Sequence, residues 1–271
     1  MPRRTFLRQL AGITGGAAMT SAVLALIEPN YALGQQVAPE DDRLAQGYVT
    51  YEGTVGPVRA YFARPADGKE PLPGILVIHE NRGLNAHIED VARRAALAGY
   101  IALAPDGLSY VGGAPQDQEM ARDKFRAADT ETITADVIKG ISYLKSRQDC
   151  NGKTGSVGFC YGGGVALKCA VADPEADASV LYYGRPLTAE EIVRLEAPIM
   201  LNYAGDDSRV NATIPEFRTA LDANGVAYSL NMYPGTGHGF HNDTSQARYD
   251  KAAAELSWRR SIGFFDHYLK S

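Results

Sequence analysis

The sequence has little cysteine and no excess of positive charge. Its 271 residues include 3 cysteines and carry a formal net charge of −5. So small and odd a number excludes a dense disulfide framework and suits one reactive thiol. No basic stripe follows the first residues, so nothing favours nucleic-acid binding. His79, His87 and His267 have no metal-ligand spacing with any cysteine, so we expect neither a metal nor another cofactor.

Long hydrophobic runs are also scarce. The uncharged stretch from Leu10 to Ile27 is only moderately apolar, because glycine, serine and threonine interrupt it. It follows Arg3 and Arg4, a pattern typical of a twin-arginine export signal, and precedes a small-residue cleavage site at 32–34. We therefore predict that residues 1–34 are an export signal read by the twin-arginine machinery. The mature protein would be periplasmic or secreted, without a stable membrane span; an uncleaved N-terminal anchor is the alternative.

Two of the three cysteines leave an alternative open. Cys150 and Cys169 are candidates for a disulfide in an oxidising periplasm. Twin-arginine export carries folded proteins, however, and Cys169 has the pattern of a buried helical residue. We expect both to be free.

The rest of the chain alternates between strand and helix patterns. Buried strands are predicted at 74–79, 100–104, 178–182, 198–203 and 226–233, with an edge hairpin at 47–51 and 58–64. Helical spacing occupies 88–98, 130–147, 214–224 and 245–270. Strands separated by such helices predict an α/β fold, a doubly wound, mostly parallel sheet with helices on both faces. Because no repeat interrupts the pattern, we expect one domain over residues 40–271. The long polar stretch 105–118 is expected to border a site.

One glycine-rich segment indicates a chemistry. Gly158, Cys160 and Gly162 have the spacing of a nucleophile elbow, the tight strand-to-helix turn that exposes a reactive side chain, with cysteine at the centre. Larger side chains two residues before or after the nucleophile would collide with it. The elbow also places the sulfur at a helix N-terminus, which favours a thiolate. The alternative is a glycine-rich turn around a buried cysteine.

Two further loops supply partners for this cysteine. Asp206 and Asp207 follow the strand at 198–203, and His238 follows the last strand. Ligands bind beyond the carboxyl ends of parallel strands, and the order nucleophile, acid, histidine is that of α/β-hydrolases. The histidine would take the thiol proton, and the aspartate would orient the imidazole. His241, in the same loop, either contacts substrate or faces solvent.

The motifs at 158–163, 204–210 and 235–240 together resemble the dienelactone hydrolases, also called carboxymethylenebutenolidases. The resemblance implies the α/β-hydrolase fold and a triad of Cys160, Asp207 and His238, with Asp206 as the less favoured acid. It also implies that Glu80 contacts the resting thiol and is displaced when substrate binds. The alternative for Glu80 is a buried carboxylate that is merely hydrogen-bonded to its loop.

The same interpretation extends to the oxyanion hole and to substrate binding. The backbone N–H groups of Tyr161 and Asn81 are predicted to form the oxyanion hole. Well-known members of the family bind the substrate carboxylate with arginines, one of them shortly after the catalytic histidine, but residues 239–243 contain none. Arg82 is the preferred replacement, with Arg122 and Arg126 as alternatives.

The sequence therefore predicts an exported, cysteine-dependent hydrolase. It would open a small lactone or cleave a compact ester through a thioester acyl-enzyme, without a cofactor and as a monomer. A broad-specificity carboxylesterase or thioesterase would share the catalytic residues and differ only in the pocket. A non-catalytic binding protein of the same fold is the alternative from another class.

Overall fold

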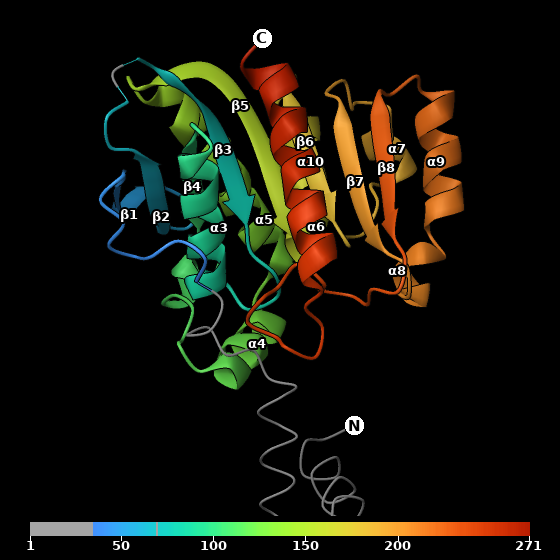
Figure 1. Ribbon diagram of the computed structural model, residues 1–271, viewed down its shortest axis with the longest axis horizontal. Helices are drawn as coiled ribbons and strands as arrows, with labels where there is room; N and C mark the ends of the chain where they lie inside the picture. The colour runs from blue at the N-terminus through green and yellow to red at the C-terminus, as the bar shows by residue number, and fades with distance from the viewer. Residues whose placement is uncertain (1–34, 69) are drawn as a thin grey trace, which may run out of the picture.

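The computed structural model describes residues 35–68 and 70–271, and the predicted export signal at 1–34 lies outside them (Figure 1). The described chain forms one eight-stranded sheet. Its strands are β1 (Leu44–Glu52), β2 (Pro57–Pro65), β3 (Leu72–Ile78), β4 (Ile101–Pro105), β5 (Cys150–Phe159), β6 (Ala178–Tyr182), β7 (Ile199–Ala204) and β8 (Tyr228–Tyr233).

The strand order is β1-β2-β4-β3-β5-β6-β7-β8. The β1–β2 hairpin and the β2–β4 pair are antiparallel, and the remaining neighbours are parallel. The predicted edge hairpin and the mostly parallel sheet are thereby confirmed. Since β3, β5, β6, β7 and β8 run the same way, the loops after them meet at one edge of the sheet.

Helices cover both faces of the sheet. They are α3 (Ala86–Leu97), α4 (Gln118–Ala127), α5 (Thr130–Ser146), α6 (Tyr161–Ala172), α7 (Ala189–Ile192), α8 (Ser208–Asn211), α9 (Ile214–Ala223) and α10 (Lys251–Leu269), with a 3₁₀ turn η1 (Ser109–Val111). In Figure 1, α3 and α10 lie in front of the sheet and α5 lies behind it. Buried side chains of α3 and α10 form one apolar core, while those of α5, α6 and α9 form cores on the other face.

Short polar side chains start many of these helices. Asn85 accepts a hydrogen bond from the Ile88 N–H at the start of α3, and Asp129 accepts one from Glu131 N–H at the start of α5. Such caps satisfy backbone donors that have no partner inside the helix. Three helices were not predicted. They are α4, which lies in and beyond the polar stretch after β4, and the four-residue helices α7 and α8, which are too short for a helical period to show in the sequence.

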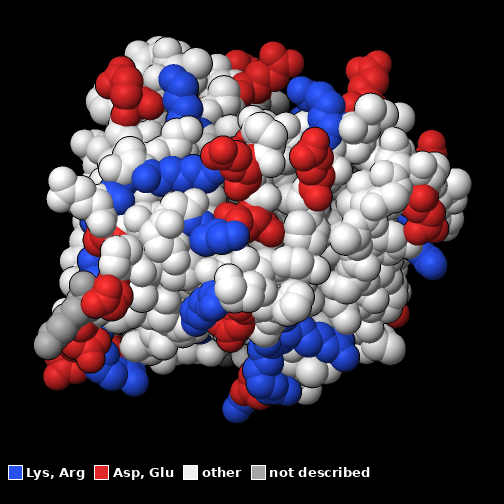
Figure 2. Space-filling model, turned by 90° about the horizontal axis from the view of Figure 1, so that it is seen from above, with Lys and Arg blue, Asp and Glu red and all other residues white. Residues whose placement is uncertain are grey.

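Charge is mixed on the end of the molecule that Figure 2 shows, which lies away from the carboxyl ends of the parallel strands. Acidic and basic side chains alternate across it without a continuous field of one sign. Among the described residues, no helix is long and apolar enough to cross a membrane.

Candidate active site

Cys160 occupies a strained turn between β5 and α6. Its backbone has φ 55° and ψ −111°, and it caps the N-terminus of α6. Within residues 35–68 and 70–271, Cys160 and Tyr183 are the two non-glycine residues with positive φ. Such conformations cost free energy and concentrate at functional sites, because the surrounding fold must hold them. The turn therefore has the geometry expected of a nucleophile elbow.

The two glycines flanking the cysteine are required by backbone contacts. A Cβ atom on Gly158 would lie 1.8 Å from the carbonyl oxygen of Gly162. A Cβ on Gly162 would lie 2.5 Å from the carbonyl oxygens of Ile78 and His79. The nearest collisions are thus with the elbow's own backbone and with the backbone at the end of β3, rather than with the cysteine side chain as the sequence predicts. No rotamer change relieves contacts between Cβ and backbone atoms.

Asp207, not Asp206, contacts the candidate histidine. The Asp207 Oδ2 atom accepts a hydrogen bond from His238 Nδ1 at 2.6 Å, and its Oδ1 atom accepts one from the Val210 N–H at 3.3 Å. Asp207 is buried and caps α8, so its carboxylate is held in one orientation. Asp206 is exposed. The bond to Nδ1 leaves Nε2 of His238 to act on a thiol or a substrate.

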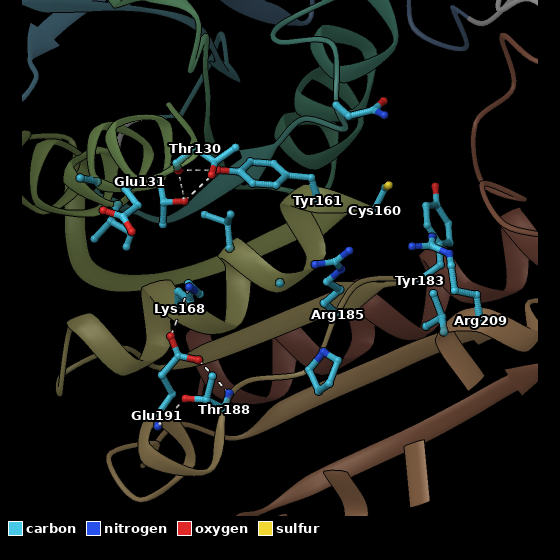
Figure 3. Close-up of a pocket in the computed structure, with 18 of the residues that line it drawn as sticks. Thr130, Glu131, Cys160, Tyr161, Lys168, Tyr183, Arg185, Thr188, Glu191 and Arg209 are labelled. Atoms are coloured by element: carbon cyan, nitrogen blue, oxygen red, sulfur yellow. Dashed lines mark hydrogen bonds and ion pairs between the residues drawn. The ribbon is translucent and has the colours of Figure 1, made fainter. Parts of the chain in front are cut away.

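One cleft collects the predicted catalytic groups. Its volume is about 970 Å³, and Cys160, His238, Asn81 and Tyr161 all line it. Figure 3 shows the Cys160 sulfur between Tyr161 and Tyr183. A molecule in this cleft would meet the thiol, the imidazole and the two loops expected to form the oxyanion hole.

The surroundings of Cys160 favour the protonated thiol in the resting site. Burial, followed by the negative charge of Glu80, raises the pKa of Cys160 to about 12. The Tyr161 N–H and the positive charges of Arg209 and Arg248 act in the opposite direction and favour the thiolate. Because burial and the carboxylate dominate, a base or a change at Glu80 is needed before the sulfur becomes a strong nucleophile.

Glu80 follows β3 and is held by the loop after β8. It is 5% exposed, and its Oε2 atom accepts a hydrogen bond from Asn242 Nδ2 at 2.8 Å. Glu80 is therefore hydrogen-bonded to the loop after β8, and its negative charge also acts on the Cys160 thiol. The sequence could not indicate Asn242 as its partner, because the two residues are 162 positions apart.

Replacing Glu80 by Gln is expected to make the resting thiol more reactive. The change removes a negative charge that raises the pKa of Cys160, so more thiolate is present at any pH below that pKa. One pKa unit corresponds to about a tenfold gain in thiolate, and we expect a gain of roughly this size in the rate of iodoacetamide alkylation at pH 8.

The measurement is the alkylation rate at Cys160 as a function of pH, followed by mass spectrometry. The curve of Glu80→Gln should be displaced toward lower pH. Glu190→Gln, which removes an exposed carboxylate from α7, is the matched control and should leave the curve in place. Superimposed curves for Glu80→Gln and the unmodified chain would show that Glu80 does not hold the thiol in its protonated form.

The polar stretch after β4 supports the site without lining the cleft. The two Asp106 carboxylate oxygens accept hydrogen bonds from the backbone N–H groups of Leu84 at 3.3 Å, Leu108 at 3.1 Å and Ala114 at 2.7 Å. No residue of 105–118 lines the cleft. The expectation that this stretch borders the site is therefore wrong. Its Asp106 side chain instead binds the backbone of the loop after β3.

The arginines are arranged differently from the expectation. Arg82 does not line the cleft, and its Nη1 donates to the Oδ1 atom of its neighbour Asn81 at 3.1 Å. Arg122 and Arg126 lie on α4 beside acidic residues of the same helix, also outside the cleft. Arg185 and Arg209 line it instead, after β6 and β7 (Figure 3). Sequence reasoning missed both: Arg185 lies in no motif, and Arg209 lies in the 204–210 motif but was not considered as a substrate-binding residue.

A third arginine approaches the histidine loop from farther along the chain. A Cβ on Gly239 would lie 3.5 Å from Arg248 Nη1, and Arg248 donates to Ser245 Oγ at 3.0 Å. Positive charge thus reaches the residue beside His238 although residues 239–243 contain no arginine.

His241 neither contacts substrate space nor faces solvent. It is fully buried and outside the cleft, stacked on Phe159 at 4.9 Å between ring centroids. Burial, followed by the positive charge of Arg94 and by His87, lowers the pKa of His241 well below its usual value. Both alternatives given for His241 are therefore wrong, because the loop folds back over the aromatic core.

The cysteine alternative is also resolved. Cys150 and Cys169 are free thiols, the first partly buried at the start of β5 and the second buried in α6. Both contribute to the apolar core between the sheet and α5.

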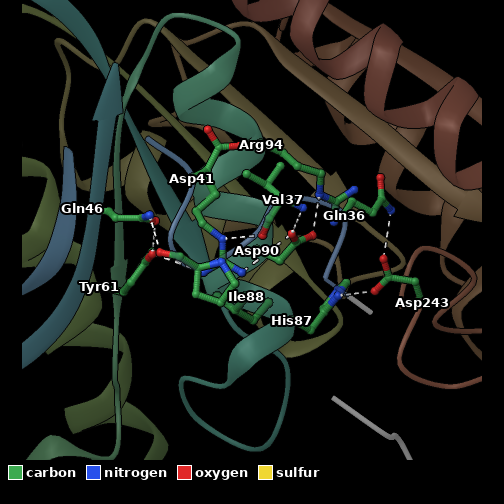
Figure 4. Close-up of polar contacts among 12 residues, drawn as sticks. Gln36, Val37, Asp41, Gln46, Tyr61, His87, Ile88, Asp90, Arg94 and Asp243 are labelled. Carbon is green, nitrogen blue, oxygen red and sulfur yellow. Dashed lines mark hydrogen bonds and ion pairs between the residues drawn. The ribbon is translucent and has the colours of Figure 1, made fainter. Parts of the chain in front are cut away.

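The first described residues form a strap, residues 35–38, tied to the histidine loop (Figure 4). The Val37 N–H donates to Asp90 Oδ1 at 2.8 Å, and the Val37 carbonyl accepts from Arg93 Nε at 2.9 Å. Gln36 Nε2 donates to Asp243 Oδ2 at 2.9 Å. Asp243 follows Asn242, which is hydrogen-bonded to Glu80. The strap therefore contacts the site indirectly, through the loop that holds Glu80.

Removing the strap is expected to destabilise the fold by roughly 3 kcal/mol or more. A form beginning at Pro39 would expose the site of the buried Val37 side chain, worth roughly 1.5–3 kcal/mol. It would also leave the buried Asp90 and Arg93 side chains without their hydrogen bonds to the Val37 backbone. Each lost hydrogen bond to a charged group costs about 1.5–3 kcal/mol of stability before the structure relaxes.

Chemical denaturation of forms beginning at Gln35 and at Pro39 would measure this. Equal free energies of unfolding would show that the strap adds nothing. Gln36→Ala in the longer form is the milder comparison, since it removes only the exposed bond to Asp243.

Comparison with known proteins gives a consistent result. The family model described as "Dienelactone hydrolase family" matches residues 58–269. Two curated relatives share the name "Putative carboxymethylenebutenolidase". The one from Saccharolobus solfataricus is 30% identical over 260 residues, covering 82% of this chain and 98% of its own length. The one from Escherichia coli K12 is 29% identical over 248 residues, covering 86% and 90%.

A solved structure shows the same architecture. The crystal structure titled "Putative Dienelactone Hydrolase" from Klebsiella pneumoniae has a TM-score of 0.74 and 26% identity to this chain. It covers 83% of this chain and 99% of its own.

Proposed function

This chain belongs to the dienelactone hydrolase family of α/β-hydrolases, and from that premise we propose that it is an exported hydrolase with Cys160 as its nucleophile. One observation carries the proposal. Cys160, on a strained elbow, and His238 line the same cleft, and His238 is hydrogen-bonded to Asp207. These three residues come from three separate loops. A binding role alone would not require this combination of strained thiol, imidazole and buried carboxylate.

The proposed reaction passes through a thioester. His238 takes the proton of Cys160, and the sulfur attacks the carbonyl carbon of a lactone or ester. The Tyr161 and Asn81 N–H groups stabilise the oxyanion. The carbon–oxygen bond to the alcohol then breaks, and His238 returns its proton to that oxygen. Water, deprotonated by His238, attacks the thioester, releases the acid and restores the thiol.

Glu80 gives the reaction a resting state. Its charge keeps Cys160 protonated until substrate enters. A substrate that displaces the carboxylate from the sulfur would lower the pKa of Cys160 in the complex, which couples activation to binding.

The test is a panel of small lactones, short alkyl esters and thioesters on the chain beginning at Gln35. Hydrolysis of lactones and compact esters, with an acyl group trapped on Cys160 by acid quench and found by mass spectrometry, supports the proposal. Turnover of thioesters alone would favour the thioesterase alternative. Hydrolysis without any adduct on Cys160 under burst conditions would contradict the cysteine mechanism.

The size of the cleft favours a second candidate, a carboxylesterase of broader specificity. At about 970 Å³ it is larger than a compact lactone needs.

We also propose that residues 1–34 direct twin-arginine export to the periplasm or beyond. Changing Arg3 and Arg4 to lysine should then leave the precursor in the cytoplasm.

A further inference from the structure

The cleft extends well beyond the reacting atoms, along the exposed side of α6. Tyr161, Gly164 and Lys168 line it in succession, and Ile138 of α5 faces them. Seven residues of helix rise about 10 Å, so the cleft continues roughly that far from the nucleophile. Cavities that hold whole drug-sized ligands have volumes of roughly 300–1,000 Å³, and this one lies near the upper limit.

Apolar side chains and threonines line most of the extension, Glu131 and Arg185 also reach it, and an ion pair lies at its far end. We call this extension the α6 channel, and its walls include Ala135, Ile138, Val165 and Pro186. At the far end, Lys168 Nζ lies 3.2 Å from Glu191 Oε1, so neither charge is unpaired there (Figure 3). Gly164 allows α6 to pack closely against the loop after β6, because a Cβ there would lie 3.2 Å from the Arg185 carbonyl oxygen.

We infer that the α6 channel binds an uncharged, apolar arm of the substrate, a chain of about eight carbon atoms or a ring system of similar length. The inference rests on the proposed function, since the arm must be attached to the ester whose carbonyl meets Cys160. It assigns to this chain a longer substrate than the compact ester that the sequence predicts. Either the acyl or the alcohol part of an ester could supply such an arm.

Three esters distinguish these sources: ethyl acetate, ethyl octanoate and octyl acetate. We expect one of the two long esters to have a kcat/KM about tenfold above that of ethyl acetate, from burial of the arm. Ethyl octanoate as the better substrate would place the acyl part in the channel, and octyl acetate the alcohol part. Ile138→Trp should reduce the ratio of long to short ester to about one by filling the channel.

Met120→Trp is the matched control, because Met120 is 63% exposed on α4 and lies outside the cleft. It should leave the ratio unchanged. Equal kcat/KM values for all three esters, or an equal loss on all three in Ile138→Trp, would overturn the inference while leaving the proposed function intact. Failure to hydrolyse any of the esters or lactones would instead contradict the proposed function.

Tyr183 carries a second, independent inference. It directly follows β6 and has φ 38°. Its side chain is 1% exposed, yet its hydroxyl has no hydrogen-bond partner among the described residues. A buried unpaired hydroxyl costs about 1–3 kcal/mol, and the backbone strain adds to this. Two unfavourable features at one residue indicate a role that the resting fold alone does not explain.

The position of Tyr183 suggests which group the hydroxyl meets. Tyr183 lines the cleft, and its ring centroid lies 5.0 Å from that of His238. Figure 3 shows its phenol rising beside the Cys160 sulfur. Burial, followed by the negative charge of Glu80, raises the pKa of Tyr183 well above its usual value, so the hydroxyl keeps its proton. It is therefore a hydrogen-bond donor directed at reacting atoms.

We propose that Tyr183 is a further catalytic residue, whose hydroxyl donates a hydrogen bond to the leaving-group oxygen beside His238. Tyr183 keeps its proton throughout, and His238 supplies the proton that the alcohol carries away. Such a bond strengthens as negative charge develops on that oxygen. The benefit should be largest for alcohols that leave poorly.

Tyr183→Phe keeps the ring and tests the hydroxyl alone. For simple alkyl esters we expect kcat to fall roughly tenfold to a hundredfold with little change in KM, and for p-nitrophenyl esters a clearly smaller loss. Tyr203→Phe is the matched control, because the Tyr203 hydroxyl on β7 is also buried without a partner among the described residues but lies outside the cleft. An equal loss on both ester classes, or no loss beyond that of Tyr203→Phe, would overturn the proposal.

Discussion

Cys160→Ala is expected to lower kcat for lactone or ester hydrolysis by roughly four orders of magnitude or more, the scale seen when a nucleophile is removed from a catalytic triad. The physical reason is that the other groups in the cleft act through the sulfur. His238 would have no thiol proton to accept, and no acyl-enzyme would form. The oxyanion hole and substrate binding would remain, so a small residual rate over water is expected.

The measurement is steady-state hydrolysis together with thermal unfolding, because the comparison requires a folded variant. Cys160→Ala removes a partly buried thiol and should leave the fold close to intact. Cys150→Ala is the matched control, since Cys150 is also a partly buried free thiol but lies at the opposite end of β5. Undiminished turnover by Cys160→Ala would require another nucleophile.

Gly158→Ala is expected to prevent stable folding, with a loss above about 4 kcal/mol, which exceeds the usual range for single substitutions. The added Cβ would lie 1.8 Å from the Gly162 carbonyl oxygen and 2.2 Å from its carbonyl carbon. Both are backbone atoms in the first turn of α6, so the strain can be relieved only by moving the helix or the end of β5. Either movement would disturb the central pair of elements in the core.

Gly263→Ala provides the matched control. Gly263 lies within α10, where an added Cβ meets nothing within 4 Å. Alanine is favoured over glycine inside a helix by about 1 kcal/mol, so this variant should be slightly more stable than the natural chain. Denaturant unfolding would compare the two. A Gly158→Ala protein that unfolds at the same denaturant concentration as the natural chain would contradict the close backbone approach in the elbow.

The order and type of most elements could be predicted because their signals are local. The apolar runs that became β3, β4, β6 and β7 are continuous in the sequence, and helical spacing identified α3, α5, α9 and α10. The boundaries differ from the observed ones by a few residues, except that the last helix was predicted to begin at 245 and begins at Lys251. There residues 246–248 form a turn, and the helix begins only after the cap at Asp250.

The site could be predicted only in part, for a related reason. Cys160 and its glycines form a contiguous motif, and His238 and Asp207 follow recognisable strands. Tyr183 and Arg185 have no such signal, and Arg209 lies in the 204–210 motif without any sign that it lines the cleft, because strand order brings these residues to the site. His241 was misjudged because its burial depends on Phe159 and Trp258, which are distant in the sequence.

The amino-acid sequence alone is enough to predict the alternation of strands and helices, the elbow and the groups able to perform acyl transfer. These depend on side-chain type and short spacing, which the chain carries wherever it folds. The fold brings Asp207 to His238, as the resemblance implied, and the fold alone brings Asn242 to Glu80 and Tyr183 beside the thiol. Such contacts join residues brought together by strand order and by packing against the sheet. Their energies, from burial, strain and charge, exist only once the distant segments are in place.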